Sequence, residues 1–521
     1  MTTVWVTIGI YIAAMVAIGV VMGRKSKGIA DFSVGGRNAG AWLSALSYGT
    51  AYFSAVMFIG YAGGTGFKFG LWAILAGIGN AIFGAWLAWR VLARRTREVT
   101  QRLKIKTMPQ YLEKRYQSNA MKIFATIVIF IFLIPYSASV YKGLSSVAQV
   151  LLGVNDKPAM IIIAVLSALL LVLGGYIVQA RADFVQGIVM MAGVVLMIVF
   201  VVRSKQVGGL AGLKEYAASD IGLPKLVSKQ WIALMSLVLM TSFGTWGLPH
   251  MIQKYYGIKD DAQAKRGISI TTFFAVLVAG GGYFIGSLCY RFYTVAQITT
   301  DKVKFPAPPQ DYIVPNMLND SNLPSVLIGI VFVLLLAASV STLCSITLTA
   351  SSTLSMDLIK GVFSKNMADK RVTTITRVLC VLFVALSYVV ANTKTPILDM
   401  MSYSWGIISG SFLAPYVLAL YWKGMNKIGA WAGILTGFFL ALPPALCKLA
   451  LVLKIAATST PDMLKLNGPS VYEDIAGKGP NYAVLAMVAS IVMCLLVSAV
   501  TSKTSSKKDS EFFYSGVVEA E

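Results

Sequence analysis

A run of small, hydroxyl-bearing residues is the clearest chemical feature of the sequence. Ser341 and Ser345 are four residues apart, so on a helix they share one face, with Ala338 about one turn earlier and Thr342 beside them. Neutral hydroxyl and carbonyl oxygens suit a hard monovalent cation that must be released again, whereas a cage of carboxylates suits divalent ions better. Ser and Thr are also common where membrane helices pack together, so the run predicts either a cation site or a helix contact.

Two ionisable residues accompany apolar stretches. Asp183 stands at the start of the apolar segment 184–203, where a carboxylate can cap a helix or hold a cation on its way through the protein. His250 follows Pro249 and can either carry protons or serve as a hydrogen-bonded structural residue. These two groups are the candidates for any proton-coupled reaction.

Two apolar segments are interrupted by residues that favour local unwinding. The segment 41–62 contains a predicted break at Gly49, and the segment 231–256 contains a second between Gly244 and Pro249. Unwound backbone at membrane depth is tolerated only where it is buried in protein or lines a cavity. When the first apolar segment is set aside, each break falls in the first helix of a group of five. Such matched breaks are typical of transporters built from inverted repeats.

The composition indicates where these segments must lie. Of 521 residues, 57% are hydrophobic and only 13% are charged, and the mean hydropathy is +0.72. A soluble protein carries about 25% charged residues, so a cytosolic enzyme, a disordered chain and a disulfide-rich secreted domain are excluded. The pattern predicts an all-α polytopic membrane protein embedded in a lipid bilayer.

About 13 segments have the length of ~20 residues that a bilayer requires. They span approximately 3–23, 41–62, 70–92, 123–152, 158–178, 184–203, 231–256, 270–297, 324–350, 374–392, 398–421, 428–452 and 482–501. The basic loops, above all 94–122, favour an N-terminus outside and a C-terminus in the cytoplasm. The net charge of +23 follows from these loops, so no nucleic-acid partner is expected.

Sequence motifs of energy-driven or hydrolytic enzymes are absent. The chain has no G-x-x-x-x-G-K-[ST] phosphate loop, no H-E-x-x-H and no G-x-S-x-G. An ATP-driven pump and an intramembrane hydrolase are therefore not expected, and the protein is predicted not to be an enzyme.

Several motifs resemble the sodium:solute symporter family. They comprise Gly35-Gly36-Arg37, the stretch Leu46 to Ala55, Phe58-Ile59-Gly60, Arg181 to Gln186, Gly247-Leu248-Pro249-His250, Gly257 to Asp260, Ala338 to Thr342 and Met356-Asp357. The resemblance implies a LeuT-like fold of two inverted five-helix repeats with sodium bound near the midplane. The stretch Thr50 to Ala55 and the Gly247–His250 motif look closest to the pantothenate and monocarboxylate branch.

The resemblance also implies site residues. The sodium ion would be held by the backbone carbonyls of Thr50, Phe53 and Ala338 and by the hydroxyls of Ser341 and Thr342. Asp183 would serve sodium release or, with Ser345, a second sodium. Cys344 stands where a further serine would be, which argues against that second ion. The solute candidates lie near the two breaks and are Ser54, Met57, Asn80, Tyr136, Ser242, Thr245 and Trp246.

These observations combine into one prediction. The chain is expected to be a monomeric, sodium-coupled symporter of the cell membrane that takes up a small organic solute by alternating access, with a carboxylate-bearing solute as first choice. A sugar or a proline-like amino acid, or coupling to protons on the same fold, is the alternative. The expected organisation is an N-terminal helix and basic loop (1–38), a first repeat (39–203), an extracellular loop (204–228), a second repeat (229–422), two further helices (423–501) and a cytoplasmic tail (502–521).

Overall fold

The protein is an assembly of long, closely packed helices. The computed structural model describes residues 2–23, 35–453, 455, 470–502 and 513. Over these residues it contains no strand, and one isolated backbone bridge pairs Ala39 with Ile258. In the same residues ten helices are long and apolar enough to cross a membrane, or eleven if one bent pair is counted as a span. The predicted class, an all-α polytopic membrane protein, is confirmed.

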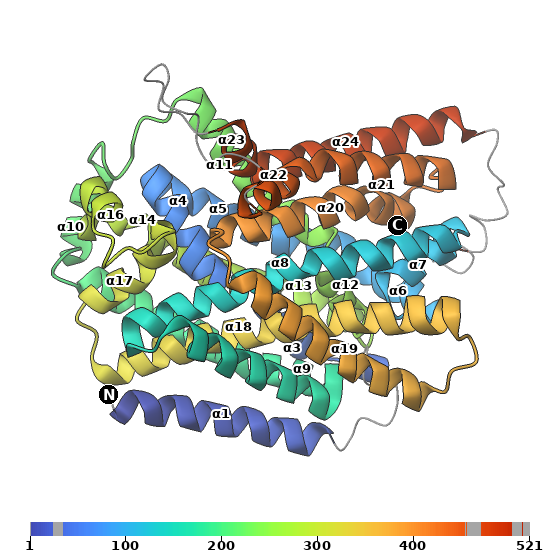
Figure 1. The fold of residues 1–521 in the computed structure, drawn as a ribbon, viewed down its shortest axis with the longest axis horizontal. Helices are drawn as coiled ribbons and strands as arrows, with labels where there is room; N and C mark the ends of the chain where they lie inside the picture. Colours follow the sequence, from blue (N-terminus) through green and yellow to red (C-terminus); the bar gives the residue numbers. More distant parts are fainter. Residues whose placement is uncertain (1, 24–34, 454, 456–469, 503–512, 514–521) are drawn as a thin grey trace.

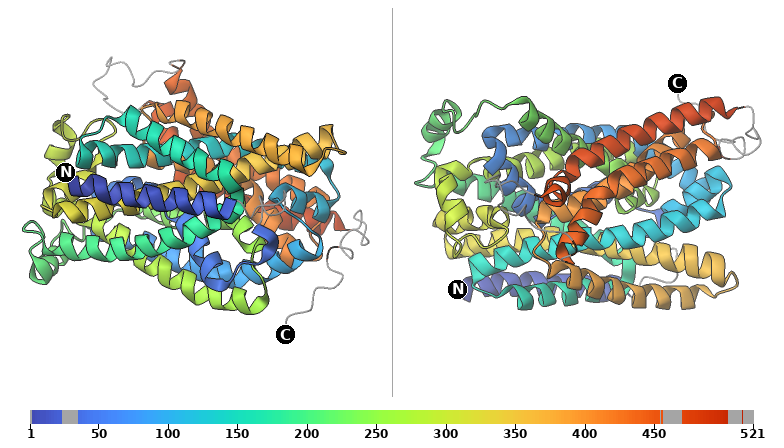
Figure 2. Two further views of the ribbon diagram at one scale, coloured as in Figure 1. Left: turned by 90° about the horizontal axis from the view of Figure 1, so that it is seen from below. Right: turned by 45° about the horizontal axis from the view of Figure 1, so that its top comes forward.

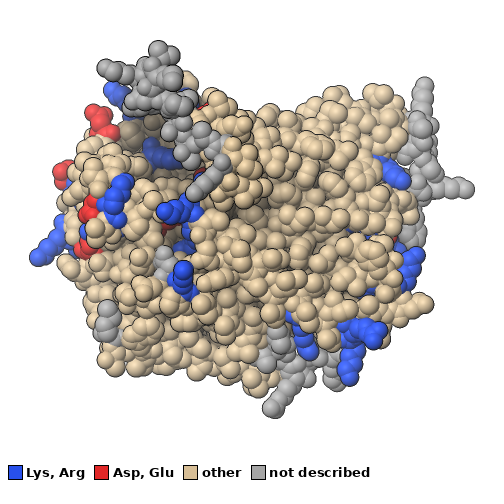
Figure 3. Space-filling view, in the orientation of Figure 1, with Lys and Arg blue, Asp and Glu red and all other residues tan. Residues whose placement is uncertain are grey.

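The helices run mostly along the long axis of the molecule (Figures 1 and 2). The space-filling view shows a broad belt with almost no charged residues, while Lys and Arg gather toward the two ends (Figure 3). Many large apolar side chains are exposed, for example Ile10, Val165, Phe439 and Val488. A bilayer supplies the apolar solvent that such a surface needs.

The first half of the chain contains both short and very long helical segments. They are α1 (Thr2–Gly23), η1 (Gly35–Arg37), α3 (Ala41–Tyr52), η2 (Val56–Tyr61), α4 (Ala62–Phe69), η3 (Gly70–Ala73), α5 (Ile74–Gly79), η4 (Asn80–Leu87), η5 (Trp89–Ala93), α6 (Arg94–Arg102), α7 (Met108–Tyr116), α8 (Asn119–Leu152), α9 (Asp156–Arg203), α10 (Gly209–Ala217), α11 (Ser228–Phe243), η6 (Gly244–Trp246) and α12 (Pro249–Tyr256).

The second half continues the same pattern. Its segments are α13 (Asp261–Ala275), η7 (Val276–Gly280), α14 (Gly281–Ser287), α15 (Cys289–Phe292), α16 (Val295–Thr300), η8 (Pro309–Tyr312), α17 (Ile313–Asp320), α18 (Ser325–Thr353), η9 (Leu354–Phe363), α19 (Asp369–Ala391), α20 (Ile397–Tyr421), α21 (Lys427–Ala441), α22 (Pro443–Val452), α23 (Val471–Ala476) and α24 (Gly479–Val500).

The two predicted breaks are present, but the first lies later in the chain than expected. Helix α3 continues past Gly49 to Tyr52, and the backbone becomes extended at Phe53, with φ −104° and ψ 93°. The prediction of unwinding at Gly49 was wrong because that glycine serves a close contact: an added Cβ would lie 2.4 Å from the ring of Phe274. The second break is where it was expected, since α11 and α12 are joined through η6 and Leu248 at a bend of 42°.

The count of about 13 spans exceeds the number of full-length helices for two reasons. The break after Tyr52 leaves α3 with 12 residues, which is too short to cross a bilayer alone. The predicted segment 158–178 corresponds to a shorter apolar helix, Lys157–Leu171. It is followed by a sharp turn at Gly175, whose φ of 59° glycine adopts readily. The predicted loop 24–37 and tail 502–521 lie largely outside the described residues.

Close helix crossings bring the interrupted segments to the centre of the bundle. Helix α18 packs against α9, α8 and α3, and α3 also packs against α9 and α12. Between α4 and α14, an added Cβ on Gly66 would lie 2.0 Å from the carbonyl oxygen of Gly286. Only glycine permits this approach, which is a common means of packing membrane helices tightly.

Candidate functional site

Backbone and side-chain oxygens converge where α3 ends against α18. The hydroxyl of Thr342 lies 3.2 Å from the carbonyl oxygen of Thr50, 3.3 Å from that of Ala51 and 3.0 Å from that of Ala338. The last carbonyls of a helix have no partner within the helix, so the end of α3 presents oxygens with a negative dipole. Phe53, the first residue of the break, directly follows this end. The structure thus brings four of the five predicted sodium ligands, Thr50, Ala338, Ser341 and Thr342, to one place beside the fifth.

Ser341 links this oxygen cluster to a buried carboxylate. Its hydroxyl lies 2.9 Å from Oγ1 of Thr50 and donates to Oδ1 of Asp183 at 2.6 Å. The other carboxylate oxygen of Asp183 accepts from the hydroxyl of Ser47 at 2.5 Å. Asp183 is fully buried. The carboxylate therefore connects α9 with both α3 and α18.

Asp183 is not a helix cap. It lies well inside α9, eight residues after the turn at Gly175, so the capping interpretation of the sequence was wrong. A glycine that bends a helix by adopting positive φ was not anticipated at that position, and the predicted segment boundary was placed at residue 184 instead. The alternative interpretation, a carboxylate beside a cation path, stays a prediction.

Lys254 is a buried charged residue beside Asp183 that sequence reasoning missed. Its ammonium lies 3.1 Å from Oδ2 of Asp183 and 2.9 Å from Oγ of Ser47, and its side chain is 2% exposed. The signal was available, because an ionisable residue inside a membrane segment is a functional candidate by default. Lys254 stands five residues after Pro249, and the sequence analysis did not single it out.

Ser345 lies on the same side of α18 but has a different partner. Its hydroxyl is bonded to the side chain of Gln179, and no hydrogen bond joins Ser345 to Asp183 among the described residues. The neighbouring Cys344 approaches the carbonyl oxygen of Ser167 at 3.7 Å.

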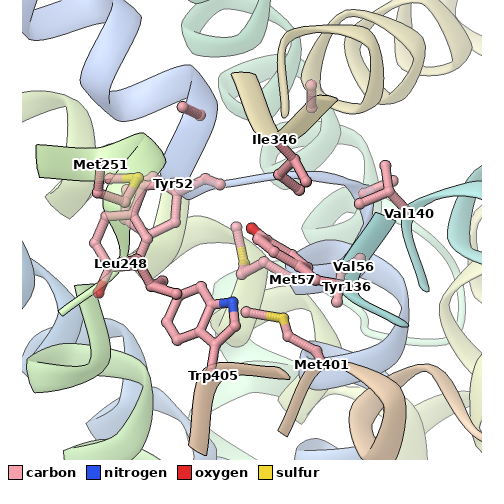
Figure 4. Packing of buried hydrophobic residues seen from close by; sticks show 14 of the residues in the cluster. Tyr52, Val56, Met57, Tyr136, Val140, Leu248, Met251, Ile346, Met401 and Trp405 are labelled. Atoms are coloured by element: carbon pink, nitrogen blue, oxygen red, sulfur yellow. The ribbon is translucent and has the colours of Figure 1, made fainter. Parts of the chain in front are cut away.

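An aromatic and methionine-lined cluster lies on the other side of the first break. Figure 4 shows Tyr136, Met57, Met401 and Trp405 pointing toward one another from α8, η2 and α20. The rings of Tyr136 and Trp405 meet edge to face with centroids 5.7 Å apart. Met57 and Tyr136, two of the predicted solute contacts, therefore face the same region.

Several polar atoms in this cluster lack partners. Within the described part of the chain, the hydroxyl of Tyr136, the indole nitrogen of Trp405 and both ring nitrogens of His250 are buried without a hydrogen bond of good geometry, and the Tyr136 hydroxyl lies near Trp405 and Ser54. The His250 ring lies 5.6 Å from that of Tyr136. Burying an unpaired polar group costs about 1–3 kcal/mol, so such a concentration marks a place where a polar ligand can supply the missing bonds.

The remaining predicted solute contacts separate into two groups. Ser54 belongs to the break itself, where its hydroxyl accepts from the backbone N–H of Val56 at 3.2 Å. The others line the contact of η4 with α11 and η6. There Ser242 donates to Asn80 at 3.2 Å, Thr245 donates to the carbonyl of Ser242 at 2.9 Å, and Trp246 donates to the carbonyl of Phe83 at 3.0 Å. Their polar groups are thus already paired, unlike those of Tyr136 and Trp405.

The second broken helix is held against α20 at this depth. The hydroxyl of Ser409 donates to the carbonyl of Gly244 at 2.5 Å. An added Cβ on Gly247 would lie 2.7 Å from Cα of Ser409, so the unwound segment approaches α20 backbone to backbone. Trp405, one turn earlier on α20, is thereby positioned beside the break.

Comparison with known sequences gives proline transporters among the relatives. The chain is 28% identical over 497 residues to the osmoregulated proline transporter OpuE of Bacillus subtilis (strain 168), with 94% of each chain covered. It is 26% identical over 445 residues to the sodium/proline symporter of Escherichia coli (strain K12), covering 84% of this chain and 86% of that one.

Comparison with solved structures supports the fold. A sodium-coupled sialic acid symporter in a substrate-bound, outward-open state matches with a TM-score of 0.74 at 15% identity, covering 96% of this chain and 97% of the other. A nucleobase-cation-symport-1 family transporter in a closed conformation matches with a TM-score of 0.53 at 12% identity, covering 92% and 98%.

The predicted membership of the pantothenate branch finds no support in these comparisons, whose named relatives are proline transporters. The family prediction itself is confirmed, since the family's sequence model matches residues 32–437. With the helical fold and the broken segments in place, the protein belongs to the sodium:solute symporter family.

Proposed function

We propose that this protein couples the inward movement of sodium to the uptake of a small amino or imino acid, with L-proline as the first solute to test. The observation that carries the proposal is the convergence of oxygens from Thr50, Ala338, Ser341 and Thr342 at the end of α3. These are neutral hydroxyl and carbonyl donors, the type that suits a monovalent cation which must leave again.

The roles of the residues follow from this geometry. The carbonyls of Thr50, Phe53 and Ala338 and the hydroxyls of Ser341 and Thr342 would coordinate the ion. Asp183 lies behind Ser341 and would receive the ion on its way to the cytoplasm. Since α3 and α18 belong to different repeats, an ion bound between them would hold the two elements together.

Coupling between sodium and solute then follows from the thermodynamic linkage of their binding. A sodium ion that orders the end of α3 also orders Ser54 and Met57 immediately after it, and solute affinity rises accordingly. The effect is reciprocal, because bound solute must raise sodium affinity by the same factor. A potential of ~100 mV adds about 2.3 kcal/mol per charge moved, before the concentration gradient is counted.

The solute assignment rests on the relatives and on the cluster around Tyr136 and Trp405. The relatives favour the proline-like alternative over the carboxylate-type solute that was the first choice. A compact zwitterion fits an apolar enclosure that offers only a few unpaired polar groups, here Tyr136, Trp405 and His250. A sugar, with many hydroxyls, would need more donors and acceptors.

The proposal includes the membrane orientation. The loop that contains α6 and α7 is rich in Arg and Lys, including Arg94, Arg95 and Lys114. Basic loops remain in the cytoplasm, so we place this end inside the cell, the N-terminus outside and the protein in the plasma membrane.

Uptake into proteoliposomes tests the proposal. With sodium outside and potassium inside, radiolabelled L-proline should accumulate above its external concentration, and the accumulation should vanish when choline replaces sodium. A panel of unlabelled amino acids, monocarboxylates and sugars should compete in that order. Accumulation driven by a pH gradient at equal sodium on both sides would contradict sodium coupling.

A further inference from the structure

The Lys254 ammonium lies in a complete shell of oxygen acceptors. It contacts Oδ2 of Asp183 at 3.1 Å and Oγ of Ser47 at 2.9 Å. With the Gln179 amide oriented so that its oxygen faces the ammonium, a third contact follows at 2.9 Å. An ammonium has three N–H donors, and all three are used. The ring of Tyr176 lies 5.3 Å away and adds a cation–π contact.

This shell has the chemistry of a cation site. A carboxylate, a hydroxyl and an amide oxygen are hard oxygen ligands of the kind that alkali and alkaline-earth ions use. The ammonium therefore stands where a bound metal cation would otherwise find its ligands. Both members of the pair are buried, and such burial is tolerated only because each charge is compensated by the other.

The shell is adjacent to the proposed sodium site and shares a residue with it. Asp183 offers Oδ2 to Lys254 and Oδ1 to Ser341, whose hydroxyl also contacts Thr50. A small cavity of about 10 Å³ lies on the α18 side of Asp183, lined in part by Gln179, Ser341 and Cys344. Its volume is about the minimum that one water molecule needs, so little rearrangement would be needed to hold an ion there.

We propose that Lys254 is a resident cation that fills a second cation-binding position beside Asp183. This inference rests on the proposed sodium coupling and adds its stoichiometry: one sodium ion moves per cycle. Lys254 neutralises Asp183, and the entering sodium contributes the single uncompensated charge. A second sodium would place three positive charges around one carboxylate in a dry interior, where uncompensated charge is strongly disfavoured.

The same argument predicts what happens when the ammonium is removed. Lys254→Gln leaves a buried carboxylate without a counter-ion, next to Ser47, Ser341 and Gln179. A sodium ion should then bind in place of the ammonium. The substituted protein should therefore bind two sodium ions, and sodium should stabilise it against heat more strongly than it stabilises the wild type.

Equilibrium binding of radioactive sodium to the purified, full-length protein in lipid nanodiscs tests the inference. We expect one bound sodium ion per protein in the wild type and two in Lys254→Gln. Lys254→Arg keeps the charge and should bind one, and the double variant Lys254→Gln with Asp183→Asn should also bind one. Thermal unfolding at zero and saturating sodium gives a second readout, with the largest sodium-induced shift expected in Lys254→Gln.

The outcomes distinguish a failure of the proposed role of Lys254 from a failure of the proposed sodium coupling. Absence of sodium binding in the wild type would overturn the proposed coupling itself. One ion in both the wild type and a folded Lys254→Gln would overturn only the role of Lys254. If Lys254→Gln does not fold, Lys254→Met replaces it. In the wild type alone, two bound ions or a Hill coefficient near two for sodium-dependent uptake would also overturn the inference.

Discussion

The hydroxyl of Ser341 donates to the carboxylate of Asp183 at 2.6 Å, deep inside the protein. This bond joins α18, which carries most of the proposed sodium ligands, to α9, which carries the nearest negative charge. Ser341 also contacts Thr50 at the broken end of α3. The coordination site and the carboxylate behind it are therefore parts of one continuous polar path.

Removing the charge of Asp183 should destabilise the protein. Asp183→Asn leaves the Lys254 ammonium buried at 2% exposure with no counter-ion, and breaking such a pair on one side costs about 3–5 kcal/mol. Adding Lys254→Gln removes the stranded charge and should recover much of the loss. Thermal unfolding in detergent measures both, with the exposed Asp220→Asn as control. Equal stability of the wild type and Asp183→Asn would show that the ion pair does not form.

The unpaired hydroxyl of Tyr136 should contribute to solute binding. Tyr136→Phe is expected to raise the KM for the solute about 5- to 10-fold, since one hydrogen bond is worth about 1 kcal/mol, while sodium activation stays unchanged. Tyr141→Phe is the matched control, because its hydroxyl is on the same helix and is equally buried and unpaired. If both variants raise KM alike, the effect comes from packing in α8 rather than from contact with solute.

Gly66 should tolerate no side chain. In Gly66→Ala the new methyl group would lie 2.0 Å from the carbonyl oxygen of Gly286, so α4 and α14 would have to separate. Overpacking of this kind costs about 1–3 kcal/mol or more. Gly280→Ala is the control, because an added Cβ there meets nothing within 4 Å. The melting temperatures of the two variants are compared, and Gly66→Ala should melt at the lower temperature. No difference between the two variants would contradict the close helix crossing.

Asp311 should make stability depend on pH. It lies in η8, outside the membrane-spanning segments, and burial raises its pKa to about 7, against the opposing effect of the Lys142 ammonium. The folded state holds the proton of the Asp311 carboxyl group more tightly than the unfolded state does. The contribution of Asp311 to the free energy of unfolding therefore falls as pH rises from about 4 to 7. Asp311→Asn should flatten that part of the pH profile of the melting temperature. A profile unchanged by the substitution would contradict the assignment.

The sequence allowed the helical fold to be predicted because it depends on local patterns, and three of the five proposed sodium ligands lie in one local stretch. Apolar runs of bilayer length mark the spans, and Ala338, Ser341 and Thr342 occupy one stretch of one helix. The pairing of that helix with Thr50 came from the family resemblance, since no spacing rule connects residues nearly 300 positions apart.

Other features depend on contacts that no local pattern contains. The break follows Tyr52 rather than Gly49 because Gly49 is needed for the contact with Phe274. Asp183 lies inside a helix because the chain turns at Gly175. Trp405 and Lys254 meet their partners Tyr136 and Asp183 only through the packing of α20 and α12 in the folded protein, so periodicity alone could not identify these contacts.

The central claim, that the oxygens at the end of α3 and on α18 bind sodium, is tested most directly at Thr342. Its hydroxyl contacts three backbone carbonyls from two helices. Among the described residues, the nearby Ser339 hydroxyl bonds only to the carbonyl of Leu335 in its own helix. The measurement is the sodium concentration that gives half-maximal binding and half-maximal uptake in Thr342→Ala, in Ser339→Ala and in the wild type. We predict an increase of about 5- to 30-fold for Thr342→Ala, the equivalent of 1–2 kcal/mol, and wild-type values for Ser339→Ala. Unchanged sodium affinity in a folded Thr342→Ala would contradict the site.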